Sequence, residues 1–194
     1  MDGRHAAPEL SNENDVVDLL LRQHGMITEL FDEVERAAGS EQGEAFQRLV
    51  RMLAVHETAE EEIVHPYARL KLEDGDTVVD RRLNEERQGK LLLSHLEQLG
   101  TDHPEFSHNL RALRATVLAH ARAEERDEFT LLRAHTSEAE RRAMAAGVRA
   151  AEAMAPTHPH PGVESATLNF LLGPPAAIID RTRDAIRKAM GRSA

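Results

Sequence analysis

The sequence predicts an all-α protein, an up-down-up-down four-helix bundle with a fifth helix and a C-terminal helical extension. Alanine, leucine, glutamate and arginine dominate the chain and favour helix, whereas aromatic residues make up only 3% of it. Apolar residues recur every three or four positions through long segments, as in helices that bury one face. No run of β-branched residues alternates with the period of two that a half-buried strand requires.

Two seams of inward-facing positions predict the first two helices, over about residues 15–38 and 41–72. Their spacings of three and four residues are those of bundle helices. In chain order the seams are Val17, Leu20, His24, Ile27, Phe31 and Val34, then Leu49, Leu53, His56, Glu60, Ile63, Tyr67 and Leu70. Pro66 lacks an amide hydrogen and is expected to kink the last turns of the second helix.

Three more helices are expected downstream. The third covers about residues 77–99, and the fourth starts with Asp102 as its N-cap and Pro104 in its first turn. Their seams are Val79, Leu83, Glu86, Lys90 and Leu93, then Leu110, Leu113, Val117, His120, Glu124 and Leu131. The pattern Ser137-x-x-Glu140 is a capping box that starts a fifth helix.

A proline-rich segment, residues 156–162, separates the bundle from the end of the chain. We therefore assign residues 1–155 to the bundle, with its core at 15–134, and residues 156–194 to a linker and a C-terminal helical extension. The extension carries isoleucines at helical spacing, which could cover the bundle or join two copies of it. A homodimer formed through this extension is the partner expectation.

Composition and charge exclude several classes of protein. At 194 residues the chain suits one domain with a core of its own, and the absence of cysteine excludes disulfides, thiolate metal sites and iron–sulfur clusters. The net charge is −10, and charges of both signs are mixed along the chain without a basic face. No stretch is long and apolar enough to span a membrane, and the N-terminus does not read as a secretion signal. We expect a cytoplasmic protein with no nucleic-acid or membrane partner.

Polar residues interrupt the seams where a bundle helix ordinarily carries leucine or isoleucine. Residues four apart lie above one another on one helix face, so His56 and Glu60 point at the same interior layer. His120 and Glu124 form a second such pair, and His24 joins from the first helix. A cluster of buried carboxylates is costly unless it is paired or metallated. A pair of cations held by ligands from several helices resolves that cost.

The sequence around the two pairs repeats. Both copies read H-x-x-x-E-E and continue to a ring residue at the same offset, His65 in the first copy and Phe129 in the second. The alternative is that the pairs are ion pairs on solvated helix faces. That alternative conflicts with the seam register, because it would also expose Leu53 and Ile63.

The arrangement resembles the hemerythrin family, in its bacterial HHE cation-binding branch, over about residues 15–132. Pro66 stands where that family commonly has a proline after its second-helix motif. The resemblance implies a non-haem site for two iron ions joined by an oxo or hydroxo bridge, with manganese or zinc as alternatives. By motif it carries over the metal ligands His24, His56, Glu60, His120 and Glu124.

The third helix departs from the family pattern. Oxygen-carrying hemerythrins have two histidines there, four residues apart, and those slots fall on Glu86 and Lys90. Glu86 is expected to be a sixth ligand, although Glu85 could face inward in its place. Lys90 cannot bind iron while protonated, so its expected role is to orient or protonate a bound oxygen species. A carboxylate-rich site stabilises ferric iron and favours reaction with oxygen or peroxide over reversible oxygen carriage.

Three further residues near the motifs have open roles. Glu125 could replace Glu124 as ligand if the helix is rotated. His65 is expected to pack in the interior or to lie near the entrance of the site. Tyr67 is expected to be a core phenol with one hydrogen bond.

These observations support two functions from different classes. The first is a non-haem di-iron protein that binds or reduces oxygen or peroxide, in a catalase-like or oxidative-stress role. Whether it turns over as a di-iron oxidoreductase is left open by the sequence. The second is an oxygen, iron or redox sensor, or a metal-binding module without turnover, in which metal occupancy changes the stability of the bundle.

Overall fold

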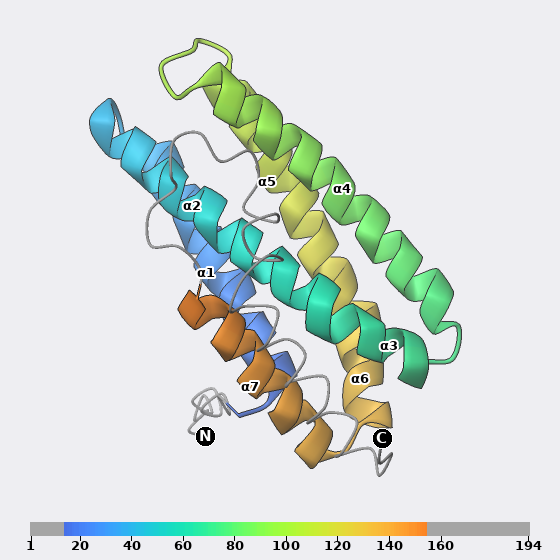
Figure 1. The fold of residues 1–194 in the computed structure, drawn as a ribbon. Helices are drawn as coiled ribbons and strands as arrows, with labels where there is room; N and C mark the ends of the chain where they lie inside the picture. The colour runs from blue at the N-terminus through green and yellow to red at the C-terminus, as the bar shows by residue number, and fades with distance from the viewer. Residues whose placement is uncertain (1–13, 155–194) are drawn as a thin grey trace, which may run out of the picture.

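Four long helical segments run antiparallel and form a bundle, and a fifth helix packs against one end of it (Figure 1). The computed structural model describes residues 14–154, and no strand occurs within that range. The expected all-α up-down-up-down bundle with a fifth helix is confirmed for this part of the chain. The expected linker and C-terminal extension lie outside the described residues. None of the described helices is long and apolar enough to cross a membrane.

Two of the four bundle segments are uninterrupted α-helices, and two contain a π-helical turn. The uninterrupted ones are α1 (Val16–Arg36) and α4 (Gly75–Leu99). The second segment consists of α2 (Ser40–Ala59), the π turn η1 (Glu60–Val64) and α3 (His65–Lys71). The fourth consists of α5 (Phe106–Ala123), the π turn η2 (Glu124–Glu128) and α6 (Phe129–His135), and α7 (Glu138–Met154) follows it.

The start of the fourth bundle segment differs from the prediction. Asp102 and Pro104 lie in the turn between α4 and α5, and the helix begins only at Phe106. The Phe106 amide donates a 2.9 Å hydrogen bond to the His103 carbonyl and closes this turn. Because the turn satisfies that amide locally, regular helical bonding starts one turn later than Asp102 would place it.

The π turns change which residues face the core. A π turn holds one more residue than an α turn between its hydrogen-bonded partners, so the inward positions beyond it move along the chain. The seams predict that Leu70 and Leu131 are buried, but Leu70 is 65% exposed and Leu131 is only partly buried. Leu72 and Leu132 are buried in their place.

Pro66 lies directly after the first π turn, in the first turn of α3. In η1 the His65 amide donates to the Glu60 carbonyl, five residues back. A proline in the first turn of an α-helical stretch is tolerated better than one in a helix interior.

A polar layer divides the hydrophobic core into two clusters. On α1, for example, His24 lies between Leu20 of one cluster and Ile27 of the other. The cluster nearer α7 includes Leu20, Ile63, Val79, Phe129 and Met144, and the other includes Ile27, Leu53, Leu93, Phe106 and Leu113. The fold therefore places the candidate ligands in the middle of the bundle, between two apolar clusters that keep water out.

Helix α7 packs on α1, α2 and the first π turn, and it begins at the expected capping box. The Ser137 amide donates to the Glu140 carboxylate at 2.6 Å, and the Glu140 amide donates to the Ser137 hydroxyl at 3.3 Å. The other Glu140 oxygen pairs with Lys71 of α3 at 2.9 Å. Although burial raises it, the hydroxyl of Tyr67 together with Lys71 and Ser137 lowers the pKa of Glu140 to about 2.

Replacing Glu140 with glutamine should destabilise the protein at neutral pH but not in strong acid. Its folded pKa lies below its ordinary value, so the ionised group stabilises the fold above about pH 4.5 and that contribution is lost as the pH falls towards 2. At pH 7 we expect the free energy of unfolding to drop by roughly 1–3 kcal/mol. Urea unfolding of both proteins from pH 7 to pH 3 measures the difference. A difference that does not shrink with falling pH would contradict this account, and the exposed Glu138→Gln serves as the control.

Candidate metal centre

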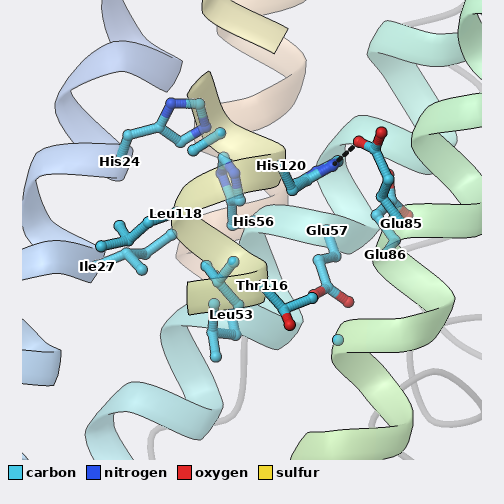
Figure 2. A pocket seen from close by; sticks show the side chains of 13 residues that line it. His24, Ile27, Leu53, His56, Glu57, Glu85, Glu86, Thr116, Leu118 and His120 are labelled. Carbon is cyan, nitrogen blue, oxygen red and sulfur yellow. Dashed lines mark hydrogen bonds and ion pairs between the residues drawn. The ribbon is translucent and has the colours of Figure 1, made fainter. Parts of the chain in front are cut away.

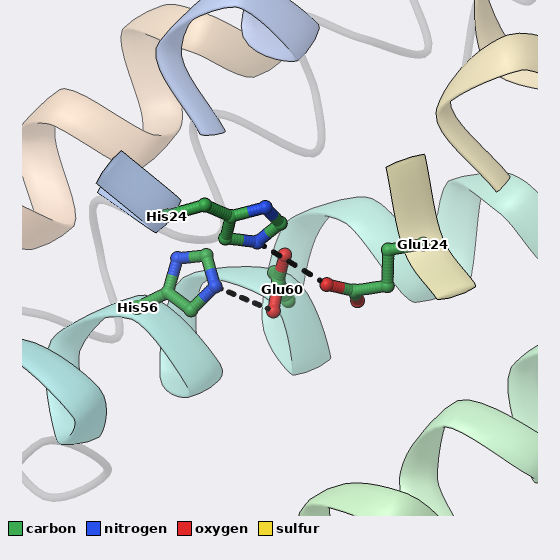
Figure 3. Close-up of side chains that lie close together, drawn as sticks. All are labelled: His24, His56, Glu60 and Glu124. Carbon is green, nitrogen blue, oxygen red and sulfur yellow. Dashed lines mark ion pairs between the residues drawn. The ribbon is translucent and has the colours of Figure 1, made fainter. Parts of the chain in front are cut away.

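Six buried side chains meet in the polar layer and form two groups that share two members. The first group is His24, His56, Glu60 and Glu124, and the second is Glu60, Glu86, His120 and Glu124. Within each group one potential ligand atom from every residue lies within 4.8 Å of the others. Figure 3 shows the first group, in which side chains from three bundle segments point toward one another. The structure thus brings together the six residues that the sequence proposes as ligands.

Glu60 and Glu124 lie at the centre, and each is the first residue of a π turn. The Nε2 atom of His56 lies 3.3 Å from Oε2 of Glu60. Nε2 of His24 lies 3.4 Å from Oε2 of Glu124, and Nε2 of His120 lies 3.3 Å from Oε1 of the same carboxylate. Each Nε2 atom therefore points at a central carboxylate.

Most of the inward atoms have no hydrogen-bond partner. They are Nε2 of His24 and of His120, both oxygens of Glu60 and of Glu124, and Oε2 of Glu86. Buried polar atoms are nearly always paired in folded proteins, so a cluster of unpaired ones needs an explanation. A donor set of nitrogen and oxygen atoms that converge on one layer fits two cations, because coordination would satisfy all of these atoms at once.

The outward nitrogens of the three histidines are all anchored. Nδ1 of His56 donates to the amide oxygen of Gln23 at 2.6 Å. Nδ1 of His24 donates to Glu125 at 2.8 Å, and Nδ1 of His120 donates to Glu85 at 3.1 Å. A hydrogen bond at one ring nitrogen fixes the tautomer and leaves the other nitrogen as the lone-pair donor, which is the usual arrangement of metal-ligating histidines.

The same contacts decide which member of each adjacent glutamate pair faces inward. Glu86 is buried in the ligand layer, whereas Glu85 is partly exposed and holds His120 from outside. Glu124 is fully buried, and Glu125 is partly exposed beside His24. The inward residues are therefore Glu86 and Glu124.

Electrostatics in the layer agree with a site that is incomplete without cations. Burial and the charges of Glu124 and Glu86 raise the pKa of Glu60 well above its ordinary value. Burial opposes ionisation of Glu124 as well, but the neighbouring imidazoles of His24 and His120 lower the pKa of Glu124 to about 2. Burial and the neighbouring His24 lower the pKa of His56 to about 3, so its imidazole is in the neutral form that binds metals.

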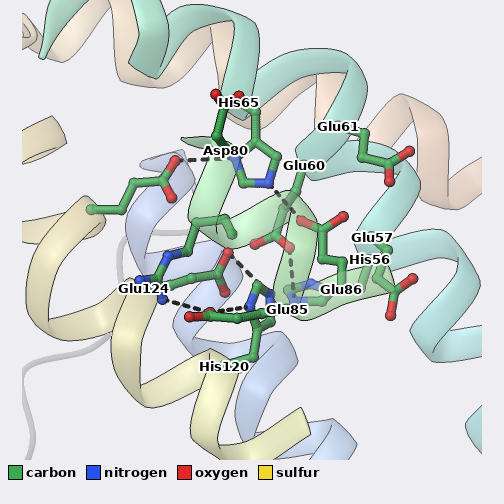
Figure 4. Close-up of polar contacts among 12 residues, drawn as sticks. His56, Glu57, Glu60, Glu61, His65, Asp80, Glu85, Glu86, His120 and Glu124 are labelled. Carbon is green, nitrogen blue, oxygen red and sulfur yellow. Dashed lines mark hydrogen bonds and ion pairs between the residues drawn. The ribbon is translucent and has the colours of Figure 1, made fainter. Parts of the chain in front are cut away.

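His65 joins the layer through two carboxylates (Figure 4). Its Nε2 donates to Oε1 of Glu86 at 2.6 Å, and its Nδ1 donates to Oε1 of Glu128 at 3.2 Å. Although burial opposes it, the hydrogen bonds that His65 makes to Glu128 and Glu86 raise the pKa of His65 to about 10. His65 is buried, as the expectation of a packing role has it, but neither expectation includes this bridging position.

Lys90 lies at the edge of the layer rather than among the ligands. It is 43% exposed and forms an ion pair with Glu61. Its ammonium also lies 3.5 Å from Glu57 and 3.8 Å from Oε2 of Glu86. Burial of Glu57 raises its pKa to about 8 against the opposing charge of Lys90.

A cavity of about 20 Å³ borders the ligand layer between α1, α2, α4 and α5 (Figure 2). It is lined by His24, Ile27, Leu53, His56, Glu57, Glu85, Glu86, Gly89, Thr116, Val117, Leu118, His120 and Ala121. A space of this size holds roughly one water-sized molecule. Lys90 does not line it, but Glu57, its ion-pair partner, does.

Sequence reasoning misses the residues that support the ligands. Gln23 and Glu128 are buried, and so is Arg82, which pairs with Glu85 at 2.9 Å. Gln23 directly precedes His24 in the sequence, but adjacency gives no direction for its side chain. Glu128 takes the place that Val64 has in the first copy of the motif, so the repeat does not mark it as a partner of the ligands.

These features define a helical-bundle protein with a buried histidine and carboxylate site for cations. The family described as the hemerythrin HHE cation binding domain matches residues 15–132. The chain belongs to that family, as its motifs suggest.

Relatives and a solved structure agree with this assignment. A hemerythrin-like protein of Schizosaccharomyces pombe is 24% identical over 176 residues, which cover 89% of this chain and 87% of that protein. A DNA nickase of Nostoc sp. is 28% identical over 123 residues, or 63% of this chain, and this match spans only 34% of the nickase. The crystal structure of a hemerythrin HHE cation binding domain-containing protein from Mycobacterium kansasii has a TM-score of 0.64 at 20% identity. That similarity covers 87% of this chain and 98% of the other, and it supports the fold.

Proposed function

We propose that this chain holds two iron ions and uses them to bind or reduce oxygen or peroxide. The observation that carries the proposal is that Glu60 and Glu124 belong to both ligand groups. A carboxylate has two oxygens, so a glutamate shared by two groups is suited to bridge a pair of ions. The terminal positions would then be His24 and His56 for one ion, and His120 and Glu86 for the other.

The donor set supports iron over softer metals. Imidazole and carboxylate ligands suit iron, manganese and zinc, and three carboxylates favour the ferric state. When bound, iron supplies one-electron redox chemistry at whatever coordination position the protein leaves open. The chain itself keeps the three imidazoles oriented through their anchored Nδ1 atoms, and the apolar clusters on both sides keep bulk water out of the layer.

The cavity supports a small substrate. At about 20 Å³ it has room for a molecule the size of water or oxygen and excludes larger organic substrates. Lys90 does not reach the cavity itself. Its ammonium lies 3.5 Å from the carboxylate of Glu57, and Glu57 lines the cavity. Orientation of an oxygen species by Lys90 is thus proposed to run through Glu57.

Protein loaded anaerobically with ferrous iron should contain two iron ions per chain and should convert hydrogen peroxide into water and oxygen. Elemental analysis gives the stoichiometry, an oxygen electrode follows the release of oxygen, and absorption in the near-ultraviolet reports a coupled di-ferric centre. Zinc-loaded protein is the control, because zinc does not change oxidation state and should release no oxygen. If the protein bound two iron ions but reacted with neither oxygen nor peroxide, it would be a metal-binding module, and the proposal of turnover would be wrong.

The alternative of a sensor depends on an output element that we expect in residues 156–194. These lie outside the described residues, so the alternative stays a prediction from the sequence.

A further inference from the structure

The two halves of the site are built on the same plan but differ in one ring residue. Each His-x-x-x-Glu motif is followed by a π turn and then by a ring as the first residue of the next helix, His65 in α3 and Phe129 in α6. Each ring lies against a ligand from a neighbouring segment. Phe129 stacks on His24 with centroids 5.6 Å apart and planes inclined by 16°, and His65 donates to Glu86 at 2.6 Å.

The ring residue matches the ligand it touches. An imidazole already anchored at Nδ1 needs only an apolar surface on its face, and Phe129 provides one. A carboxylate whose second oxygen is buried needs a hydrogen-bond donor, and a phenyl ring at position 65 would leave Oε1 of Glu86 unpaired. The replacement of a histidine by Glu86 in the ligand layer is therefore accompanied by a donor at the adjoining ring position.

A third position follows the same pattern. Glu128, which accepts the other hydrogen of His65, stands at the place in its motif that Val64 occupies in the first copy. Val64 belongs to the apolar cluster near α7, whereas Glu128 is fully buried beside His65. His65 therefore lies between two buried carboxylates, with one ring nitrogen against each.

We propose that His65 is a positioning residue that adapts the site to Glu86 as a ligand, with Glu128 holding His65 in place. His65 occupies Oε1 of Glu86, so Oε2 is the oxygen directed to the cation. Oε2 is buried without a hydrogen-bond partner, and the Lys90 ammonium lies 3.8 Å from it. This inference rests on the two-metal site proposed above.

The test uses cobalt(II) as the probe, because its visible absorption reports ligand geometry without turnover. Titration of the wild-type protein should show two equivalents. His65→Phe should weaken one of them by about 10- to 100-fold and change its spectrum, as loss of a group that orients a ligand does elsewhere. His65→Gln keeps one donor toward Glu86 and should retain most of the affinity. Phe129→Leu, which removes only the apolar contact on the other half, should change affinity by less than about threefold.

A triple variant, Glu86→His with His65→Phe and Glu128→Val, gives the side of the site around Glu86 the residue types that surround His24. It should bind both equivalents within a few-fold of wild type, although Glu86→His alone leaves His65 facing another histidine and should bind worse. If His65→Phe fails to fold, His65→Gln and the triple variant decide the matter. If folded His65→Phe still bound two cobalt equivalents with unchanged affinity, or if the triple variant did not recover the lost affinity, the role of His65 would be overturned while the metal site would stand. Wild-type protein that binds no cobalt would overturn the metal site itself.

Discussion

Replacing Glu60 with leucine should abolish binding of both metal ions and, at the same time, make the metal-free protein more stable. Glu60 is fully buried, both its oxygens lack hydrogen-bond partners, and its pKa is raised by burial and by neighbouring carboxylates. Removing such a group relieves a cost of about 1–3 kcal/mol. With metal present the order should reverse, because only the wild-type protein gains the stabilisation that a bound ligand confers.

Thermal unfolding with a chelator and with excess ferrous iron, together with elemental analysis, measures both effects. The control is Glu44→Leu, an exposed position on the same helix, which should keep two equivalents and change stability by less than about 0.5 kcal/mol. His24→Leu provides a second comparison, since His24 belongs to one group only and its loss should spare one ion. If Glu60→Leu retained two equivalents, Glu60 would not be a ligand.

Replacing Gly89 with alanine should slow the proposed reaction with peroxide while leaving both metal ions bound. Gly89 lines the cavity, and a methyl group added to it would meet no atom within 4 Å, so it would extend into open space. Helix α4 itself should gain about 0.5–1 kcal/mol, because alanine is the better helix former. A methyl group in a cavity of about 20 Å³ leaves little room for a substrate. We expect the rate of peroxide consumption at low concentration to fall by roughly tenfold to a hundredfold, the equivalent of a 1–3 kcal/mol overpacking cost.

Gly25→Ala is the matched control for this prediction. Gly25 lies on α1, its added methyl group would also meet no atom within 4 Å, and it does not line the cavity. It should give a similar gain in stability and no change in peroxide consumption. Equal rates for both variants would place the substrate somewhere other than this cavity.

Much of the fold could be predicted because the seams follow simple helical geometry. All six seam positions of α1, from Val17 to Val34, are buried in the structure. The prediction still holds at Ile63 and Tyr67 but fails one turn further on, where Leu70 is exposed, and at Leu131, which follows the second π turn and is only partly buried. A regular helical repeat cannot show this, because the extra residue changes no residue type and appears only as a shift in register.

The sequence predicts the candidate ligands at the centre of the site, but not the residues that hydrogen-bond to these ligands and orient them. His56 and Glu60 can be recognised because they interrupt an apolar seam. The second copy of the motif, around His120, supports the same interpretation. Gln23 and Arg82 break no pattern, and their direction is fixed only by tertiary packing. His65 looked like a packing residue because its two carboxylate partners, Glu86 and Glu128, come from other segments of the bundle.

Because of the two π turns, the site depends on the number of residues that follow each central glutamate. Each turn amounts to a single inserted residue, placed directly after a central glutamate. Deleting one residue from Glu61, Glu62 or Ile63 would restore a regular helix with better backbone bonding, yet it would rotate His65 away from Glu86. A one-residue deletion there should therefore keep the helical fold and, like His65→Phe, weaken one of the two proposed metal equivalents.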